Sequence, residues 1–150
     1  MVIAEIMTRE VESVPPDASL QEAAQVMDSR NVGSLPVCNG ERLIGVITDR
    51  DIVVRAVALG SSPSETTVHE CMTVDATYAF EDEDVDAALE RMKALQIRRL
   101  IVLSREKRLV GVLALGDIAT EPDAAPNADV GAAIAEISEP ARPVSTGPKP

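Results

Sequence analysis

The sequence has almost no aromatic side chains. Among its 150 residues there is one tyrosine, Tyr78, one phenylalanine, Phe80, and no tryptophan. Proteins that bind single-stranded nucleic acids stack bases on aromatic rings, so this composition disfavours that class of function. Because 45% of the residues are nevertheless hydrophobic, we expect a core built from aliphatic side chains and methionine.

Positive charge is also scarce. The chain has 14 lysines and arginines against 25 aspartates and glutamates, which gives a formal net charge of −11. Affinity for nucleic acids depends on cations that neutralise phosphates, so we expect no nucleic-acid partner. The same acidic field disfavours polyanionic ligands at long range.

Several signals of other protein classes are missing. No hydrophobic run approaches the roughly 20 residues of a membrane-spanning helix, and no basic segment of the signal-peptide type opens the chain. We therefore expect a cytoplasmic protein with no membrane partner. Without a glycine-rich phosphate loop, and with His69 as the only histidine, we expect no enzyme and no catalytic cofactor.

What the sequence does contain is an internal repeat. A shift of 65 residues aligns Glu5-Ile6-Met7-Thr8 with Glu70-Cys71-Met72-Thr73. After a one-residue insertion, a shift of 66 aligns residues 42–46 with 108–112. The domains that we expect are two repeats at 1–60 and 66–120, joined by a linker at 61–65.

Both copies show the same order of patterns. A short extended stretch, 11–14 or 77–80, precedes a helix that begins at a capping residue, Ser19 or Asp84. Two short apolar runs typical of paired strands follow, and then a second helix. We therefore expect an α/β (α+β) fold, with two β-α-β-β-α units packed sheet to sheet about a pseudo-two-fold axis.

The two copies differ at their ends. In the first copy the pattern predicts a helix over 49–59 followed by Gly60, and in the second Pro122 ends the matching helix early. The tail at 121–150 is rich in proline and alanine. We expect one short helix there, at about 127–138, and disorder after 139.

These residues resemble a known family. Leu35-Pro36-Val37 and Gly45-Val46-Ile47-Thr48-Asp49-Arg50-Asp51-Ile52 are similar to parts of one CBS domain, the module named after cystathionine β-synthase. Leu100-Ile101-Val102 and Gly111-Val112-Leu113 are similar to parts of a second. Two such domains in tandem form a Bateman module, and the chain resembles stand-alone pairs of the small bacterial hypoxic-response type.

The resemblance implies a regulatory role. CBS pairs bind adenosine compounds such as AMP, ADP, ATP, NAD or S-adenosylmethionine in clefts between their repeats, and through that binding they regulate another protein. They also resemble half of a flat disc of four repeats, which implies a homodimer. The alternative is a structural or protein-interaction pair whose ligand clefts are vestigial.

The resemblance places Thr48 and Asp51 at a ribose site. In the family, a Ser/Thr-x-x-Asp motif after the second strand holds the ribose, and an ionised carboxylate can accept both hydroxyls of a vicinal diol. The same motif also suits a helix start, with Thr48 as the cap and Asp51 in the first turn. In the second copy Ala114 replaces the hydroxyl residue, and only Asp117 remains.

Arg98 and Arg99 occupy positions where members of the family place phosphate-binding cations, a role that suits guanidinium groups. The first copy has Gly33 and Ser34 there, so the better ribose motif and the better phosphate motif lie in different copies. One mixed site, with Arg98 reaching across or Arg50 assisting, is a hypothesis. The alternative is a solvated charge pair that protects a strand edge.

The segment Tyr78-Ala79-Phe80 corresponds to the one that borders the adenine in the family, where an aromatic ring could stack on the base. The spacing of its two rings fits a strand with one buried face equally well. Val14, Val32 and Ile97 complete the set of ligand-binding residues that the resemblance implies.

Two patterns suggest a metal site only weakly. The acidic run at 81–86 lacks the spacing and the glycine of a calcium-binding loop, and it is typical of the start of a helix. Cys38, Cys71 and His69 lack a recognised zinc spacing. We expect a solvated helix start, two buried thiols and no metal.

Overall fold

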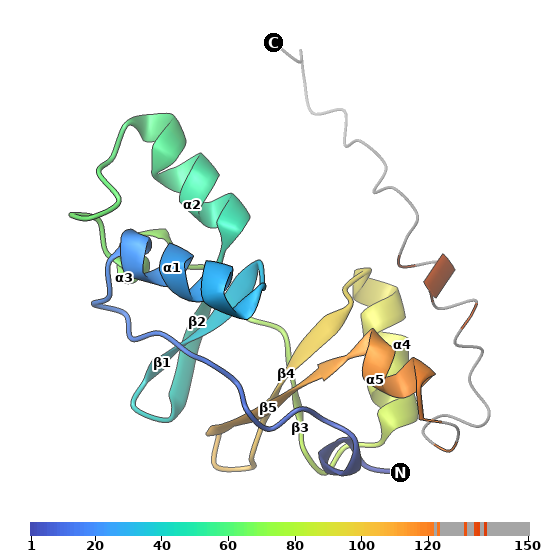
Figure 1. Cartoon of the computed structure of the whole chain (residues 1–150). Helices are drawn as coiled ribbons and strands as arrows, with labels where there is room; N and C mark the ends of the chain where they lie inside the picture. Colours follow the sequence, from blue (N-terminus) through green and yellow to red (C-terminus); the bar gives the residue numbers. More distant parts are fainter. Residues whose placement is uncertain (122, 124–130, 132–133, 136, 138–150) are drawn as a thin grey trace.

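The computed structural model describes residues 1–121, 123, 131, 134–135 and 137. Its elements form two groups, each a small sheet with helices (Figure 1). The first group comprises α1 (Leu20–Arg30), β1 (Ser34–Asn39), β2 (Arg42–Thr48), α2 (Asp49–Arg55) and η2 (Val57–Leu59). The second comprises β3 (Tyr78–Phe80), α4 (Val85–Leu95), β4 (Arg99–Leu103), β5 (Leu109–Ala114) and α5 (Leu115–Ala119). Two short helical turns, η1 (Ile3–Glu5) and α3 (Val68–Cys71), precede the two groups in the chain.

Each group is built on an antiparallel hairpin with the same irregularity. The register of β1 and β2 shifts between Val37 and Cys38, and that of β4 and β5 shifts between Val102 and Leu103. β3 adds a parallel strand to the second sheet. In the first sheet the equivalent strand is reduced to a single bridge between Val14 and Val37, because two prolines follow Val14 and offer no amide to continue a ladder.

The first helix of each repeat begins where the sequence predicts. Ser19 Oγ accepts a hydrogen bond from the amide of Glu22 at 3.1 Å, and the Glu22 carboxylate accepts one from the amide of Ser19 at 3.3 Å. This reciprocal pair is a capping box. In the second repeat, Asp84 caps α4 by accepting a hydrogen bond from the amide of Asp86 at 3.0 Å.

The helix predicted over 49–59 is shorter than expected. α2 ends at Arg55, and Ala56 leaves helical geometry with φ of −126°. The chain then makes the short turn η2 and reaches Gly60, whose φ of 75° is the left-handed conformation that glycine adopts freely. The β-branched run at 52–54 has low helix propensity, which favours this early end.

The short turns that precede the two repeats are exchanged between the groups. Ile3 and Met7, from the start of the chain, are buried in the hydrophobic core of the second group. Val68 and Cys71, from α3, are buried in the core of the first group. Figure 1 shows the N-terminus beside β3 and α3 beside α1. Each core is therefore completed by the segment that precedes the other repeat.

Reciprocal backbone contacts define the pseudo-two-fold axis. Thr8 forms a bridge with Val112, and Thr73 forms one with Val46. Each bridge consists of two backbone hydrogen bonds of 2.8 to 2.9 Å. Thr8 and Thr73 are equivalent positions, as are Val46 and Val112, so exchanging the repeats exchanges the two contacts. The expected pair of similar α/β units is thus confirmed.

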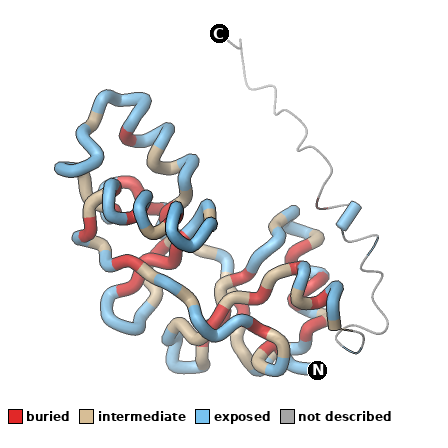
Figure 2. The backbone as a smooth tube through the Cα atoms, in the orientation of Figure 1, coloured by how far each residue is buried: buried red, intermediate tan, exposed pale blue. Residues whose placement is uncertain are grey.

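Figure 2 shows buried residues inside both groups and exposed residues along their outer helices. The cores are aliphatic, as the composition predicts, and among the residues that the structure describes no polar or charged residue is buried. The large, fully buried side chains include Leu20, Leu35 and Ile47 in the first group and Leu89, Leu100 and Leu113 in the second.

Most of the predicted tail lies outside the described residues. The helix expected at about 127–138 is described only at residues 131, 134–135 and 137, which are helical. Ile137 is buried in the core of the second group. The disorder expected after 139 lies wholly outside the described residues. No helix within the described ranges is long and apolar enough to cross a membrane.

Candidate functional site

A cavity of about 720 Å³ lies between the two repeats. It takes equivalent positions from both, because Thr8 and Thr73 line it, as do Val46 and Val112. These four residues also form the two reciprocal bridges. Further equivalent pairs in the lining are 10 and 75, 11 and 76, 12 and 77, 32 and 97, 34 and 99, and 48 and 114. The cavity therefore straddles the pseudo-two-fold axis.

The two halves of the cavity differ in chemistry. At one pair of equivalent positions the first repeat supplies the hydroxyl of Thr48 and the second supplies Ala114. At another, the first repeat supplies Ser34 and the second supplies Arg99. Asp117, from α5, also lines the cavity. At these positions the first repeat supplies hydroxyl groups, and the second supplies a guanidinium and a carboxylate.

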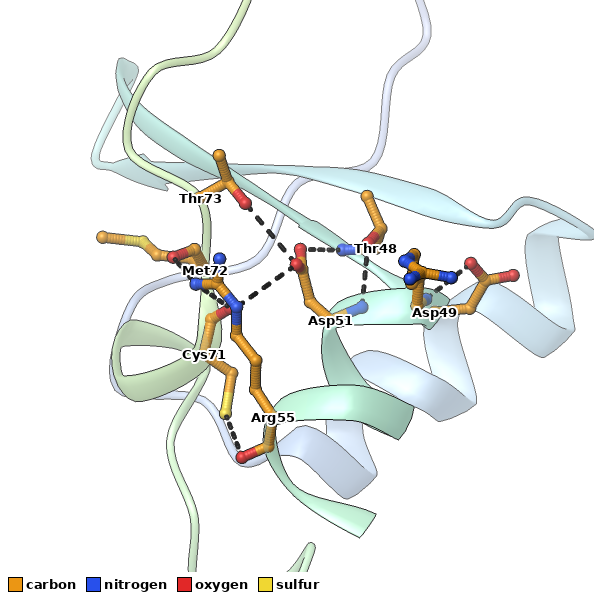
Figure 3. Close-up of polar contacts among 8 residues, drawn as sticks. Thr48, Asp49, Asp51, Arg55, Cys71, Met72 and Thr73 are labelled. Carbon is orange, nitrogen blue, oxygen red and sulfur yellow. Dashed lines mark hydrogen bonds and ion pairs between the residues drawn. The ribbon is translucent and has the colours of Figure 1, made fainter. Parts of the chain in front are cut away.

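Asp51 is held by contacts within the fold (Figure 3). One carboxylate oxygen accepts a hydrogen bond from the amide of Thr48 at 3.0 Å, and Thr48 Oγ1 accepts one from the amide of Asp51 at 3.0 Å. The other oxygen accepts a hydrogen bond from Thr73 Oγ1 at 3.5 Å and lies 3.8 Å from Arg55 Nε. These contacts fit the helix-start interpretation of the Thr48-x-x-Asp51 motif, and they tie α2 to the exchanged segment at Thr73.

Asp117 is the equivalent of Asp51 and has fewer constraints. Its Oδ2 accepts a hydrogen bond from the amide of Ala114 at 2.9 Å. Because alanine has no side-chain oxygen, it cannot supply the return hydrogen bond of a capping box. Asp117 lines the cavity, where its carboxylate is available as an acceptor for a ligand hydroxyl.

The structure brings five of the predicted site residues to this cavity. They are Val32, Thr48, Ile97, Arg99 and Asp117. The others lie outside its lining, namely Val14, Gly33, Arg50, Asp51, Tyr78, Ala79, Phe80 and Arg98.

The residues outside the lining have identifiable surroundings. Val14 and Ala79 are buried in the first and second cores. Arg50 is exposed on α2. The Gly33 carbonyl accepts a hydrogen bond from the amide at the start of α2. Arg98 lines a second cavity beside α5, which Arg99 also borders.

Tyr78 and Phe80 pack against each other, and Phe80 also packs against Arg105. Their ring centroids are 5.5 Å apart in an edge-to-face arrangement. The Arg105 guanidinium lies 4.2 Å from the Phe80 ring centroid, a cation–π contact. Along β3 only Ala79 is buried, so both rings lie on the face of the strand away from the core.

The acidic run at 81–86 forms ion pairs as well as a helix start. Asp82 accepts hydrogen bonds from Arg105 at 3.0 Å, and these bonds lower the pKa of the exposed Asp82 carboxyl. Glu83 accepts a hydrogen bond from Arg91 at 2.7 Å. The same arginine donates to the Tyr78 carbonyl at 2.9 Å, which anchors β3 to α4.

Sequence reasoning missed the two segments that form much of the cavity wall, 8–12 and 73–77. Both begin at the threonine of the Met-Thr pair with which the repeats align. The repeat alignment placed these segments at equivalent positions. It could not show that each crosses to the other repeat, because that crossing depends on contacts between distant parts of the chain.

Comparison with known proteins identifies relatives across most of the chain. The family model for the CBS domain matches residues 3–57 and 68–123. The CBS domain-containing protein YhcV of Bacillus subtilis is 36% identical over 136 residues, 91% of this chain and 94% of that protein. Hypoxic response protein 1 of Mycobacterium tuberculosis is 37% identical over 116 residues, 77% of this chain and 80% of that protein.

Solved structures show the same fold. The crystal structure of Hypoxic Response Protein I with two coordinated zinc ions has a TM-score of 0.71 at 35% identity, covering 79% of this chain and 97% of that one. The CBS domain pair of protein MJ0100, in complex with 5′-methylthioadenosine and S-adenosyl-L-methionine, has a TM-score of 0.67 at 28% identity, covering 79% and 93%. The protein PAE2072 from Pyrobaculum aerophilum, complexed with AMP, has a TM-score of 0.68 at 27% identity, covering 81% and 92%.

Because the crystal structure of Hypoxic Response Protein I contains two coordinated zinc ions, a metal site in this chain has to be considered. Among the described residues, no group of three or more His, Cys, Asp or Glu side chains is placed to hold a metal ion. Cys38 and Cys71 are buried free cysteines, as the sequence predicts. Burial raises the pKa of both thiols. Cys38 and Cys71 therefore belong to no such group among the described residues.

Proposed function

Because this chain belongs to the CBS domain family and carries two of these domains in tandem, we propose that it is a regulatory module that senses an adenosine-containing nucleotide. The ligand binds in the cavity between the repeats. That cavity, at about 720 Å³, has the size of a typical small-molecule site.

The observation that carries this proposal is the lining of the cavity by equivalent positions of both repeats. A ligand there contacts Thr48 from one repeat and Arg99 and Asp117 from the other. These side chains supply a hydroxyl, a cation and a carboxylate, which suit the hydroxyls and phosphate of a nucleotide. Support also comes from two solved relatives, one complexed with AMP and one with 5′-methylthioadenosine and S-adenosylmethionine.

The reciprocal bridges suggest how binding becomes a signal. Thr8, Val112, Val46 and Thr73 join the repeats and also line the cavity. A ligand that contacts all four favours one arrangement of the repeats over others, and its differential affinity sets the size of the shift. No catalytic group is part of this proposal. The match to an inosine-5′-monophosphate dehydrogenase of Methanocaldococcus jannaschii covers only 22% of that enzyme.

The test is calorimetric titration of the full chain with a panel of adenosine compounds. We expect at least one member to bind, and a ligand at 100 times its Kd to add about 2.7 kcal/mol to the free energy of unfolding. Arg99→Gln should weaken the binding of a phosphorylated member. Arg42→Gln is the matched control, because Arg42 is exposed and lies outside the cavity lining.

The second candidate is a structural or protein-interaction pair with vestigial clefts. It is favoured by Ala114, which lacks the hydroxyl of its equivalent Thr48, and by the Asp51 carboxylate, which is engaged in the capping box, with Thr73 and with Arg55. If no adenosine compound binds or stabilises the protein, this candidate replaces the first.

We also propose that the chain forms a homodimer. Val53, Val54, Val57 and Leu59, on α2 and η2, are 47 to 75% exposed, and an exposed apolar cluster favours an interface. Sedimentation equilibrium should give twice the monomer mass, and Val54→Asp should shift the protein toward the monomer. A wild-type protein that sediments as a monomer at all concentrations would contradict this proposal.

A further inference from the structure

The cavity between the repeats carries more negative than positive side chains. Among the residues that the structure describes, its charged lining residues are Glu10, Glu12, Arg30, Asp75, Arg99 and Asp117, with a formal charge of −2. Arg30 is engaged with Glu12, since its Nη2 lies 2.7 Å from Glu12 Oε2. Of the other charged lining residues, Arg99 supplies one guanidinium, and Glu10, Asp75 and Asp117 supply three carboxylates.

The carboxylates lie in both halves of the cavity. Glu10 and Asp75 are equivalent positions of the two repeats, each two residues after the threonine that bridges to the other repeat. Asp117 adds a third carboxylate from α5. A ligand on the pseudo-two-fold axis therefore meets acidic groups from both repeats, whichever way it is oriented.

Resting on the proposed function, we infer that this cavity selects adenosine ligands whose 5′ substituent is uncharged or cationic over those that carry phosphates. Adenosine, 5′-methylthioadenosine and S-adenosylmethionine belong to the first class, and AMP, ADP and ATP to the second. Like charges within one site repel, and opposite charges attract. The sulfonium and ammonium groups of S-adenosylmethionine complement the carboxylates, whereas each added phosphate opposes them.

Arg99 determines the order of affinity among the phosphorylated ligands. It supplies one guanidinium, which suits a single phosphate, and the equivalent position in the first repeat is Ser34. AMP is therefore accommodated better than ATP, whose further phosphates meet no second unpaired guanidinium among the described lining residues. The expected order of affinity is S-adenosylmethionine first, adenosine and 5′-methylthioadenosine next, then AMP, and ATP last.

Calorimetric titration of the full chain with these compounds, without added divalent cations, tests this order. At low ionic strength we expect S-adenosylmethionine to bind about tenfold more tightly than AMP, since two or three partly exposed charge contacts each contribute a few-fold. The ratio should shrink at high salt, because the Debye length falls.

A pair of matched double variants assigns the effect to the cavity. Glu10→Gln with Asp75→Asn should reduce the ratio of S-adenosylmethionine to AMP affinity by about fivefold. Glu65→Gln with Glu106→Gln removes the same net charge from exposed residues outside the cavity lining and should leave the ratio unchanged. An equal response in both double variants would assign the preference to net charge and overturn the inference.

The titration results distinguish a failure of the charge selection from a failure of the proposed nucleotide sensing. If AMP or ATP binds more tightly than S-adenosylmethionine and adenosine, the charge selection is wrong while nucleotide sensing stands. If none of the compounds binds, both fall.

Discussion

Gly111 lies where β5 passes closest to the N-terminal segment. A Cβ atom added there would lie 2.6 Å from the Thr8 carbonyl oxygen and 2.8 Å from Met7 Sδ. The Thr8 oxygen cannot move aside freely, since it accepts a hydrogen bond from the amide of Val112 at 2.9 Å. An alanine at this position must therefore push the N-terminal segment away from β5.

The expected cost of Gly111→Ala has two parts. Forcing a methyl group into a packed contact costs about 1–3 kcal/mol. Weakening the two backbone hydrogen bonds between Thr8 and Val112 removes about 1 kcal/mol for each. We therefore expect the free energy of unfolding to fall by about 3–5 kcal/mol, which lowers Tm by on the order of 10–20 °C.

Urea unfolding followed by far-ultraviolet circular dichroism measures this change in a chain without tryptophan. Gly116→Ala is the matched control, because no atom outside its own helix lies within 4 Å of the added Cβ. Alanine in α5 should be neutral or stabilise the fold by up to about 1 kcal/mol. If Gly111→Ala unfolds at the wild-type urea concentration, the close contact is refuted, and with it the exchange of the N-terminal segment.

Three further predictions concern the core, a cap and the response to acid. Leu100 is fully buried in the second core, so Leu100→Ala should lower the free energy of unfolding by about 2–5 kcal/mol in urea; a loss below that range would contradict its place in the core. Ser19→Ala removes the hydroxyl that caps α1 and should cost about 1 kcal/mol by the same assay, and no loss would show that the cap is dispensable. Burial raises the pKa of Glu83, but hydrogen bonds from Arg91 and the Phe80 amide outweigh it and hold that pKa below its ordinary value. The charged Glu83 therefore adds stability above its ordinary pKa, and this is lost as the pH falls through the lower folded-state value. Acid titration of Glu83→Gln should show a shallower loss over that window, and an unchanged slope would contradict the ion pair.

Much of the fold could be predicted from the repeat. Ser19 and Asp84 mark the starts of their helices, and Gly60 ends the helical segment of the first repeat. The resemblance to a stand-alone CBS pair is confirmed. These features depend on local patterns, such as caps, apolar periodicity and turn residues. Because these patterns occur in both copies of the repeat, each copy supports the prediction made for the other.

The exchange of the turns that precede the repeats could not be predicted in this way. Ile3 and Val68 are apolar residues in equivalent amphipathic turns, and the pattern shows that each turn packs on a sheet. It does not show on which sheet, since both repeats present similar apolar surfaces. Long-range contacts such as those of Gly111 and Gly45 with the exchanged segments decide between the two.

The candidate site could be predicted only in part for the same reason. Thr48 and Asp117 occupy positions of the Ser/Thr-x-x-Asp motif, Arg99 begins β4, and all three line the cavity. Asp51 matches the motif equally well, but its carboxylate is engaged by Thr48, Thr73 and Arg55. The contact with Thr73 exists because the exchanged segment passes α2, and local spacing carries no information about it.

The proposed function requires that one ligand occupies the cavity and contacts both repeats. Hydrogen–deuterium exchange by mass spectrometry tests it directly, with the protein saturated by the adenosine compound that binds most tightly. We expect slower exchange in the segments 8–12 and 73–77 together, since both form the cavity wall. Protection confined to one of these segments, or to neither, would contradict it.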